Sequence, residues 1–112
     1  MEEVKLTWTY NEFKAYLLIY AAESNQIVTE EEKDFIETQF DTLIIKAIQN
    51  EIKADNDYQR IHKIMAYIEQ NNLSKTDLDE LLQEINAVYQ SDGKYDMTER
   101  GVFQFLEKLF KI

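Results

Sequence analysis

Residues 9–23 read TYNEFKAYLLIYAAE, and this stretch decides the fold class. Thr9 and Glu12 have the spacing of a capping box, in which a hydroxyl accepts a hydrogen bond from a first-turn amide and a glutamate reaches back. Apolar residues follow at helical spacing and predict an α-helix. The residues expected on its inward face are Phe13, Leu17, Tyr20 and Ala21.

The same capping signal recurs along the chain. It pairs Thr29 with Glu32 and, in looser form, Ser74 with Asp77 and Asp96 with Glu99. Each pair precedes another apolar stripe of helical period. No proline and only two glycines occur in 112 residues, so almost nothing can break a helix or build a hairpin. The sequence therefore predicts a single all-α domain over residues 1–112, a compact bundle of five to six helices with a helix–loop–helix near each end.

Short polar turns separate the expected helices. A second helix opens after Thr29, and Asp41-Thr42 either starts a third helix or lies inside one continuous helix. Residues 54–57 form a turn, the next helix ends near 71–72, and Ser91-Asp92-Gly93 ends the helix that Ser74 begins. One face of the helix after residue 57 is expected to consist of Tyr58, Ile61, Met65 and Ile68.

The expected core gathers the inward positions of all these helices. Its members are Phe13, Leu17, Phe35, Ile36, Phe40, Ile44, Ile48, Ile61, Met65, Leu81, Leu82, Ile85, Phe103 and Leu106. Three tyrosines, Tyr58, Tyr67 and Tyr89, either line a partner groove or form the wet edge of this core.

The charge of the chain limits its partners. Twelve basic and 22 acidic residues give a net charge of −10, which repels phosphate backbones and anionic lipid headgroups. We therefore expect neither nucleic acid nor membrane as a partner, and a basic protein surface or a cation suits the chain better. The apolar run from Ala15 to Ala22 is too short to cross a bilayer, and the first residues do not read as a secretory signal. A cytoplasmic location is expected.

Few residues of this sequence are candidates for a catalytic role. The absence of cysteine excludes disulfides and thiolate chemistry, and the single histidine, His62, excludes a histidine-cluster metal site. His62 lies beside an apolar stripe and is expected to be a partly exposed helix-face residue, because no nucleophile is near it in sequence. We expect that the protein is not an enzyme and needs no cofactor beyond, at most, a weakly held divalent cation.

Two segments of the chain look alike, residues 20–33 and residues 88–99. Either Thr29 corresponds to Thr98, or Asn25 and Glu32 correspond to Asp92 and Glu99. The second alignment is preferred because residues 92–99 have the spacing of the back half of an EF-hand loop, with an acid before a glycine and a closing glutamate.

The candidate metal ligands are Asp92, Asp96 and Glu99. The first two ligand positions of the loop would fall on Val88 and Gln90, and a valine side chain offers no oxygen. The three acids of the other segment, residues 30–32, occupy a first helical turn that favours negative charge in any case. Any calcium site in this chain is therefore expected to be weak.

This paired pattern resembles the TerB-like tellurite-resistance family. Ala21-Ala22 followed by residues 28–32 matches the N-terminal copy of its motif, and Asp92-Gly93 with Glu99 matches the C-terminal copy, while Asn25-Gln26 stand in place of the first Asp-Gly. The resemblance spans roughly residues 13–110. It implies a compact all-α fold, no catalysis, and a part in stress response or complex assembly. The favoured function is a TerB-like protein-binding or scaffolding module, and the alternative is a divalent-cation sensor.

Overall fold

The computed structural model describes residues 8–23, 30–90 and 97–110, and within the last range it describes only the backbone of 97–100 and 102. The described chain forms six helices and contains no strand: α1 (Tyr10–Glu23), α2 (Glu30–Glu37), α3 (Thr42–Ala54), α4 (Asp57–Gln70), α5 (Lys75–Gln90) and α6 (Met97–Phe110). The predicted all-α bundle is confirmed. Its radius of gyration of 13.3 Å is that of a compact domain of this length.

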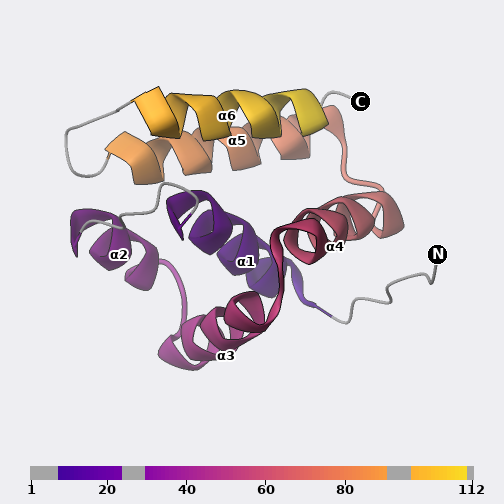
Figure 1. Cartoon of the computed structure of the whole chain (residues 1–112). Helices are drawn as coiled ribbons and strands as arrows, with labels where there is room; N and C mark the ends of the chain where they lie inside the picture. Colours follow the sequence, from indigo (N-terminus) through magenta and orange to yellow (C-terminus); the bar gives the residue numbers. More distant parts are fainter. Residues whose placement is uncertain (1–7, 24–29, 91–96, 111–112) are drawn as a thin grey trace.

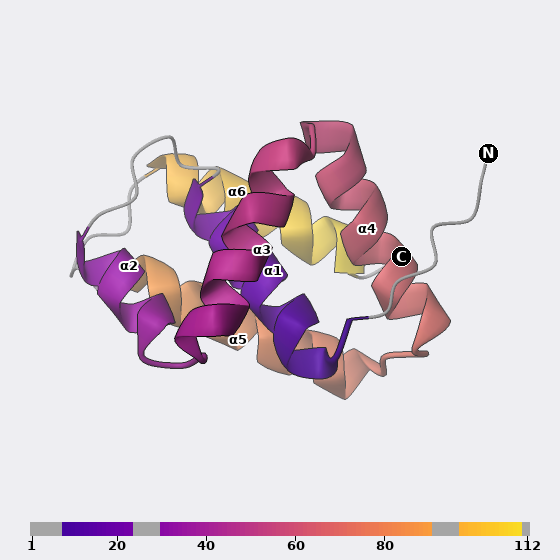
Figure 2. The same cartoon turned by 90° about the horizontal axis from the view of Figure 1, so that it is seen from below.

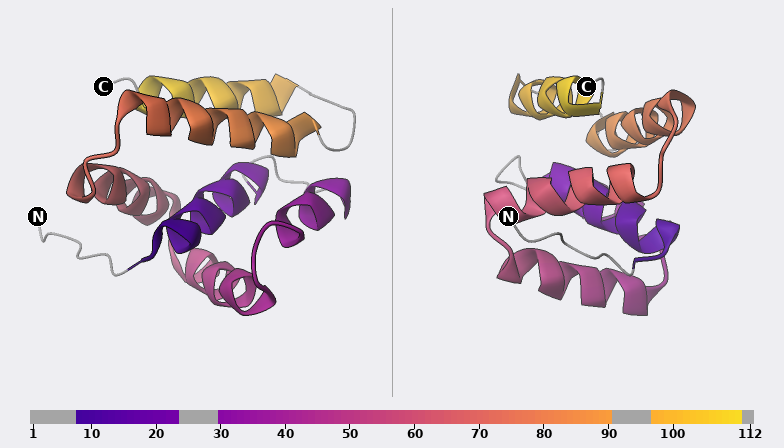
Figure 3. Two further views of the ribbon diagram at one scale, coloured as in Figure 1. Left: turned by 180° about the vertical axis from the view of Figure 1, so that it is seen from behind. Right: turned by 90° about the vertical axis from the view of Figure 1, so that its right-hand side faces the viewer.

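The six helices are arranged in layers around α1. Helices α5 and α6 lie side by side in one layer, α1, α2 and α4 form a middle layer, and α3 closes the opposite side (Figure 1, Figure 3). Seen from below, α3 crosses α1 (Figure 2). None of the described helices combines the length and the apolar character needed to cross a bilayer.

Helix α1 is buried on nearly all sides, which the single inward face expected from the sequence did not anticipate. It packs against α2, α3, α4 and α5, so that Ala15, Tyr16, Leu18 and Ile19 are buried together with the predicted Phe13, Leu17 and Ala21. Tyr20, also expected inside, is only half-buried. A helix that is apolar all round is the type expected at the centre of a bundle.

The helix starts follow the capping signals wherever both capping residues are described. The Thr9 amide donates to Glu12 Oε1 at 2.9 Å, and the Glu12 amide donates to Thr9 Oγ1 at 3.2 Å. Ser74 and Asp77 make the same reciprocal pair at 3.0 and 3.1 Å. The predicted caps at Thr29 and Asp96 lie outside the described residues.

Two further caps divide the middle of the chain. Asp41 accepts from the Leu43 amide at 2.9 Å, so α2 and α3 are separate helices. Asn56 and Gln59 form a capping box at the start of α4, where the sequence predicted only a turn over residues 54–57.

The prediction of which face of α4 is buried was wrong. Its buried residues are Ile64 and Tyr67, whereas Ile61 and Met65 are half-buried and Tyr58 is 63% exposed. The apolar residues of α4 form an arc wide enough to contain both faces, so periodicity alone could not decide which part of that arc is buried. In α3 the predicted Ile48 is buried and Ile44 is half-buried, while Ile45 and Ile52 are buried as well and Leu43 is 76% exposed.

The remaining core predictions hold for α5 and in part for α2 and α6. The three expected core residues of α5, Leu81, Leu82 and Ile85, are buried, and Leu78 and Val88 of the same helix are buried with them. In the other helices, Ile36, Leu106 and Phe110 are buried, and the half-buried Phe35, Phe40, Ile44 and Phe103 pack against the core. The side chain of Val102 lies outside the description.

Candidate functional site

Most of the candidate metal ligands predicted from the sequence have no described side chain. Asp92 and Asp96 lie outside the described residues, and Glu99 belongs to α6 without a described side chain. We also expect the turns around Asn25 and Asp92 to lie close together, as paired helix–loop–helix turns do, and both turns lie outside the described residues. Within the ranges that are described, no group of three or more metal-ligating side chains comes together.

The three acidic residues in the first turn of α2 differ in how exposed they are. Glu30 and Glu31 are exposed, whereas Glu32 is completely buried. From the sequence, all three were expected to be acids of a first helical turn that favours negative charge. Burial of a glutamate in the first turn was not predicted, because a capping pattern specifies a backbone contact and not the depth of the side chain.

The densest polar cluster ties α1, α3 and α4 together around Asp55. The carboxylate oxygen Oδ2 of Asp55 accepts from the Tyr16 hydroxyl at 2.8 Å and from Lys63 Nζ at 2.7 Å. Lys63 Nζ also donates to Glu51 Oε2 at 2.9 Å, and Glu51 Oε1 accepts from Trp8 Nε1 at 3.3 Å. This Asp55 cluster therefore connects the segment before α1 with the end of α3 and the middle of α4.

The electrostatics of the Asp55 cluster follow from its depth. Burial, then the hydrogen bond to Asp55, raises the pKa of Tyr16 far above its usual value. Burial lowers the pKa of Lys63, but its hydrogen bonds to Asp55 and Glu51 outweigh that effect, and the net shift is upward. Both groups are held in their protonated forms at neutral pH, which suits a structural connection.

The C-terminal end of α3 is closed by a side chain from α4. Arg60 donates from Nε and Nη2 to the carbonyl oxygen of Ile52 at 3.0 and 2.7 Å, and from Nη1 to Asp57 at 3.1 Å. A cation at the C-terminus of a helix is attracted by the negative end of the helix dipole. Arg60 thereby fixes the angle between α3 and α4.

The tyrosines and the histidine separate into core and surface residues. Tyr67 and Tyr89 are buried, and the Tyr89 hydroxyl donates to the carbonyl oxygen of Ala21 at 2.7 Å, so neither lines an open groove. Tyr58 is exposed and stacks on His62 with ring centroids 5.8 Å apart. The prediction that His62 is a partly exposed helix-face residue is confirmed.

An acidic groove of about 380 Å³ runs between α1 and α5. We define this α1–α5 groove by its lining: Tyr10, Lys14, Glu80, Gln83, Glu84 and Ala87. Tyr10 is 40% exposed. Burial of the remainder, then the charges of Glu84, Asp77 and Glu80, raises the pKa of Tyr10.

One basic side chain already lies in the α1–α5 groove. Lys14 Nζ pairs with Glu84 Oε1 at 2.6 Å and lies 5.9 Å from the centroid of the Tyr10 ring. Glu80 is exposed and makes no ion pair with any residue that the structure describes. The groove thus combines an aromatic face with one paired and one open carboxylate.

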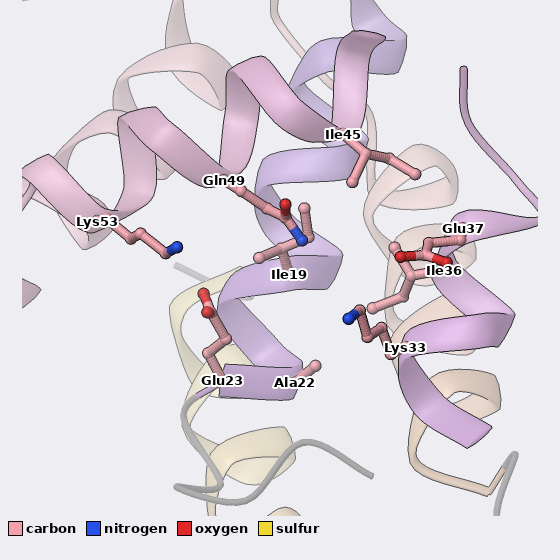
Figure 4. A pocket seen from close by; sticks show the side chains of 9 residues that line it. All are labelled: Ile19, Ala22, Glu23, Lys33, Ile36, Glu37, Ile45, Gln49 and Lys53. Atoms are coloured by element: carbon pink, nitrogen blue, oxygen red, sulfur yellow. The ribbon is translucent and has the colours of Figure 1, made fainter. Parts of the chain in front are cut away.

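A second pocket, of about 290 Å³, lies between α1, α2 and α3 (Figure 4). Its apolar floor is formed by Ile19, Ala22, Ile36 and Ile45, all buried in the core. Its polar rim consists of Glu23, Lys33, Glu37, Gln49 and Lys53. We call it the α1–α3 pocket.

The charged groups of the α1–α3 pocket come from three different helices. In Figure 4, Lys53 and Glu23 point toward one another on one side, and Lys33 points into the space above the apolar floor. Burial raises the pKa of Glu23, and the positive charges of Arg60 and Lys53 offset part of that shift. Sequence reasoning missed this pocket because its members are scattered over residues 19–53 and share no motif.

Comparisons with known proteins leave the site to be judged on its geometry. No protein-family model, no curated protein and no solved structure matches this chain.

Proposed function

We propose that this chain is a non-enzymatic, TerB-like protein-binding or scaffolding module that acts in the cytoplasm, in stress response or complex assembly. Its partner is a basic segment of another protein. The single observation that carries this proposal is the α1–α5 groove, where the half-open ring of Tyr10 stands beside the carboxylates of Glu80 and Glu84.

The chemistry of this groove suits an arginine or lysine side chain. A cation is attracted to the face of an aromatic ring and forms its strongest hydrogen bonds with carboxylates. Lys14 already makes both kinds of contact, with Tyr10 and with Glu84. A partner side chain would repeat this arrangement at the open carboxylate of Glu80.

The overall charge supports the same conclusion. A net charge of −10 produces a long-range field that attracts basic surfaces and speeds their association. The groove then gives this attraction a defined location. The Asp55 cluster supports a non-enzymatic role, because its hydrogen bonds are engaged in holding α1, α3 and α4 together.

Chemical-shift mapping of the whole chain with a lysine-rich peptide tests the proposal. We expect the largest amide shifts at Tyr10, Gln83 and Ala87, which line the groove on two helices. A glutamate-rich peptide of the same length serves as the control and should produce no shifts there. Shifts spread evenly over every acidic surface, or concentrated outside α1 and α5, would contradict the proposal.

A further inference from the structure

The α1–α3 pocket has an unusual charge distribution for so acidic a protein. Its rim holds two lysines and two glutamates, so it is formally neutral. Among the described residues, none of Glu23, Lys33, Glu37 and Lys53 has an ion-pair partner within 4 Å. Two positive and two negative groups therefore surround the pocket, and none of them is held in a direct ion pair with a described residue.

This charge distribution discriminates between classes of ligand. A simple anion would be attracted by Lys33 and Lys53 but would meet the like charges of Glu23 and Glu37. A simple cation would be attracted by Glu23 and Glu37 but would meet the like charges of Lys33 and Lys53. Only a zwitterion can set its carboxylate toward an ammonium group and its own ammonium toward a carboxylate, with both contacts favourable.

The floor and the size of the pocket further restrict the class of ligand that fits it. Ile19, Ala22, Ile36 and Ile45 offer an apolar surface to a side chain, and the Gln49 amide adds a neutral donor and acceptor. A volume of about 290 Å³ stands at the lower end of the range for ligand pockets and suits a small molecule.

We propose that the α1–α3 pocket binds a free α-amino acid with an apolar side chain. The side chain rests on the isoleucines of the floor, the carboxylate faces Lys33, and the ammonium group faces Glu23 on the opposite side of the pocket. Because the rim is open to water, affinity is in the millimolar range. This site is independent of the α1–α5 groove, so either can fail while the other stands.

Titration of the full chain with leucine, followed by methyl and amide chemical shifts, tests the proposal. Isocaproate has the leucine skeleton without the amino group, and isoamylamine has it without the carboxylate. We expect leucine to shift the methyl groups of Ile19, Ile36 and Ile45 in a saturable manner. Each analogue should bind about tenfold more weakly, the loss expected for one charge-assisted hydrogen bond.

Two lysine variants separate the pocket from general charge effects. Lys33→Gln should weaken leucine binding about tenfold, whereas Lys46→Gln, an exposed lysine of α3 outside the pocket, should leave it unchanged. Helical circular dichroism checks that both variants fold. Absence of saturable shifts at the three isoleucines, equal binding of either analogue, or equal effects of the two variants would overturn the proposal.

Discussion

The Tyr16 hydroxyl donates a 2.8 Å hydrogen bond to Asp55 Oδ2, joining the middle of α1 to the residue that follows α3. Tyr16 is completely buried, and Lys63 of α4 shares the same carboxylate oxygen at 2.7 Å. Three helices therefore meet at one oxygen atom. A polar connection at this depth fixes how α3 and α4 sit on the central helix, because leaving any of its groups unpaired is costly.

Replacing Tyr16 with phenylalanine should destabilise the protein measurably. The ring stays in place, but Asp55 loses one of its two donors, and we expect the free energy of unfolding to fall by about 1–3 kcal/mol. Urea unfolding followed by circular dichroism gives the value. Tyr58→Phe is the matched control, since its 63% exposed ring should change stability by about 0.5 kcal/mol or less. Equal effects of the two changes would contradict the account of the cluster.

Stability should decline in alkaline solution. The pKa of Tyr16 is raised from 10.0 and that of Lys63 from 10.5, so the folded chain keeps protons that the unfolded chain releases. Their contribution is complete below about pH 10 and is lost as pH rises through the folded-state values. Urea titrations between about pH 8 and pH 11 measure this loss. In Tyr16→Phe the decline should be shallower, and a stability that increases with pH over this range would refute the assignment.

The register of α4 can be tested with one pair of substitutions. Ile64 is completely buried and Ile61 is half-buried, three residues apart on the same helix. Ile64→Ala should cost about 2–5 kcal/mol, as truncation of a buried isoleucine does, and Ile61→Ala should cost clearly less. A larger loss at Ile61 would restore the face that the sequence predicted.

Much of the fold could be predicted from the sequence because capping side chains mark the residues at which the helices begin. The capping pairs Thr9–Glu12 and Ser74–Asp77 both form as predicted. The amphipathic pattern of α5 gave its buried face correctly, since one apolar stripe faces one polar stripe.

Helix faces and sites were less accessible for physical reasons. In α1 apolar residues surround most of the helix, and in α4 they form an arc wider than the buried face. The buried side therefore depends on which neighbours pack there and not on period alone. The Asp55 cluster joins residues 16, 55 and 63, and the α1–α3 pocket joins three helices. Contacts across such sequence distances leave no local pattern. The predicted ligands Asp92, Asp96 and Glu99 await a direct test.

Calcium binding tests the alternative function, a divalent-cation sensor. With no oxygen at Val88 and a neutral Gln90, the loop lacks the full set of about six to eight ligands, and we expect calcium to bind no tighter than the millimolar range. Isothermal titration of the metal-free protein measures this affinity. Micromolar binding that disappears in Asp92→Ala and Glu99→Ala would favour the sensor over the binding module.

Recognition of a basic partner segment by the α1–α5 groove can be tested with charge-matched double variants. Glu80→Gln with Glu84→Gln removes two charges from the groove, and Glu30→Gln with Glu31→Gln removes two exposed charges from α2. Fluorescence anisotropy with a labelled lysine-rich peptide compares both with the unchanged protein. We expect the groove variant to bind the peptide about tenfold more weakly and the α2 variant to bind it nearly as well as the unchanged protein. Equal weakening in both variants would mean that the peptide responds to net charge alone, and would contradict a defined site in the groove.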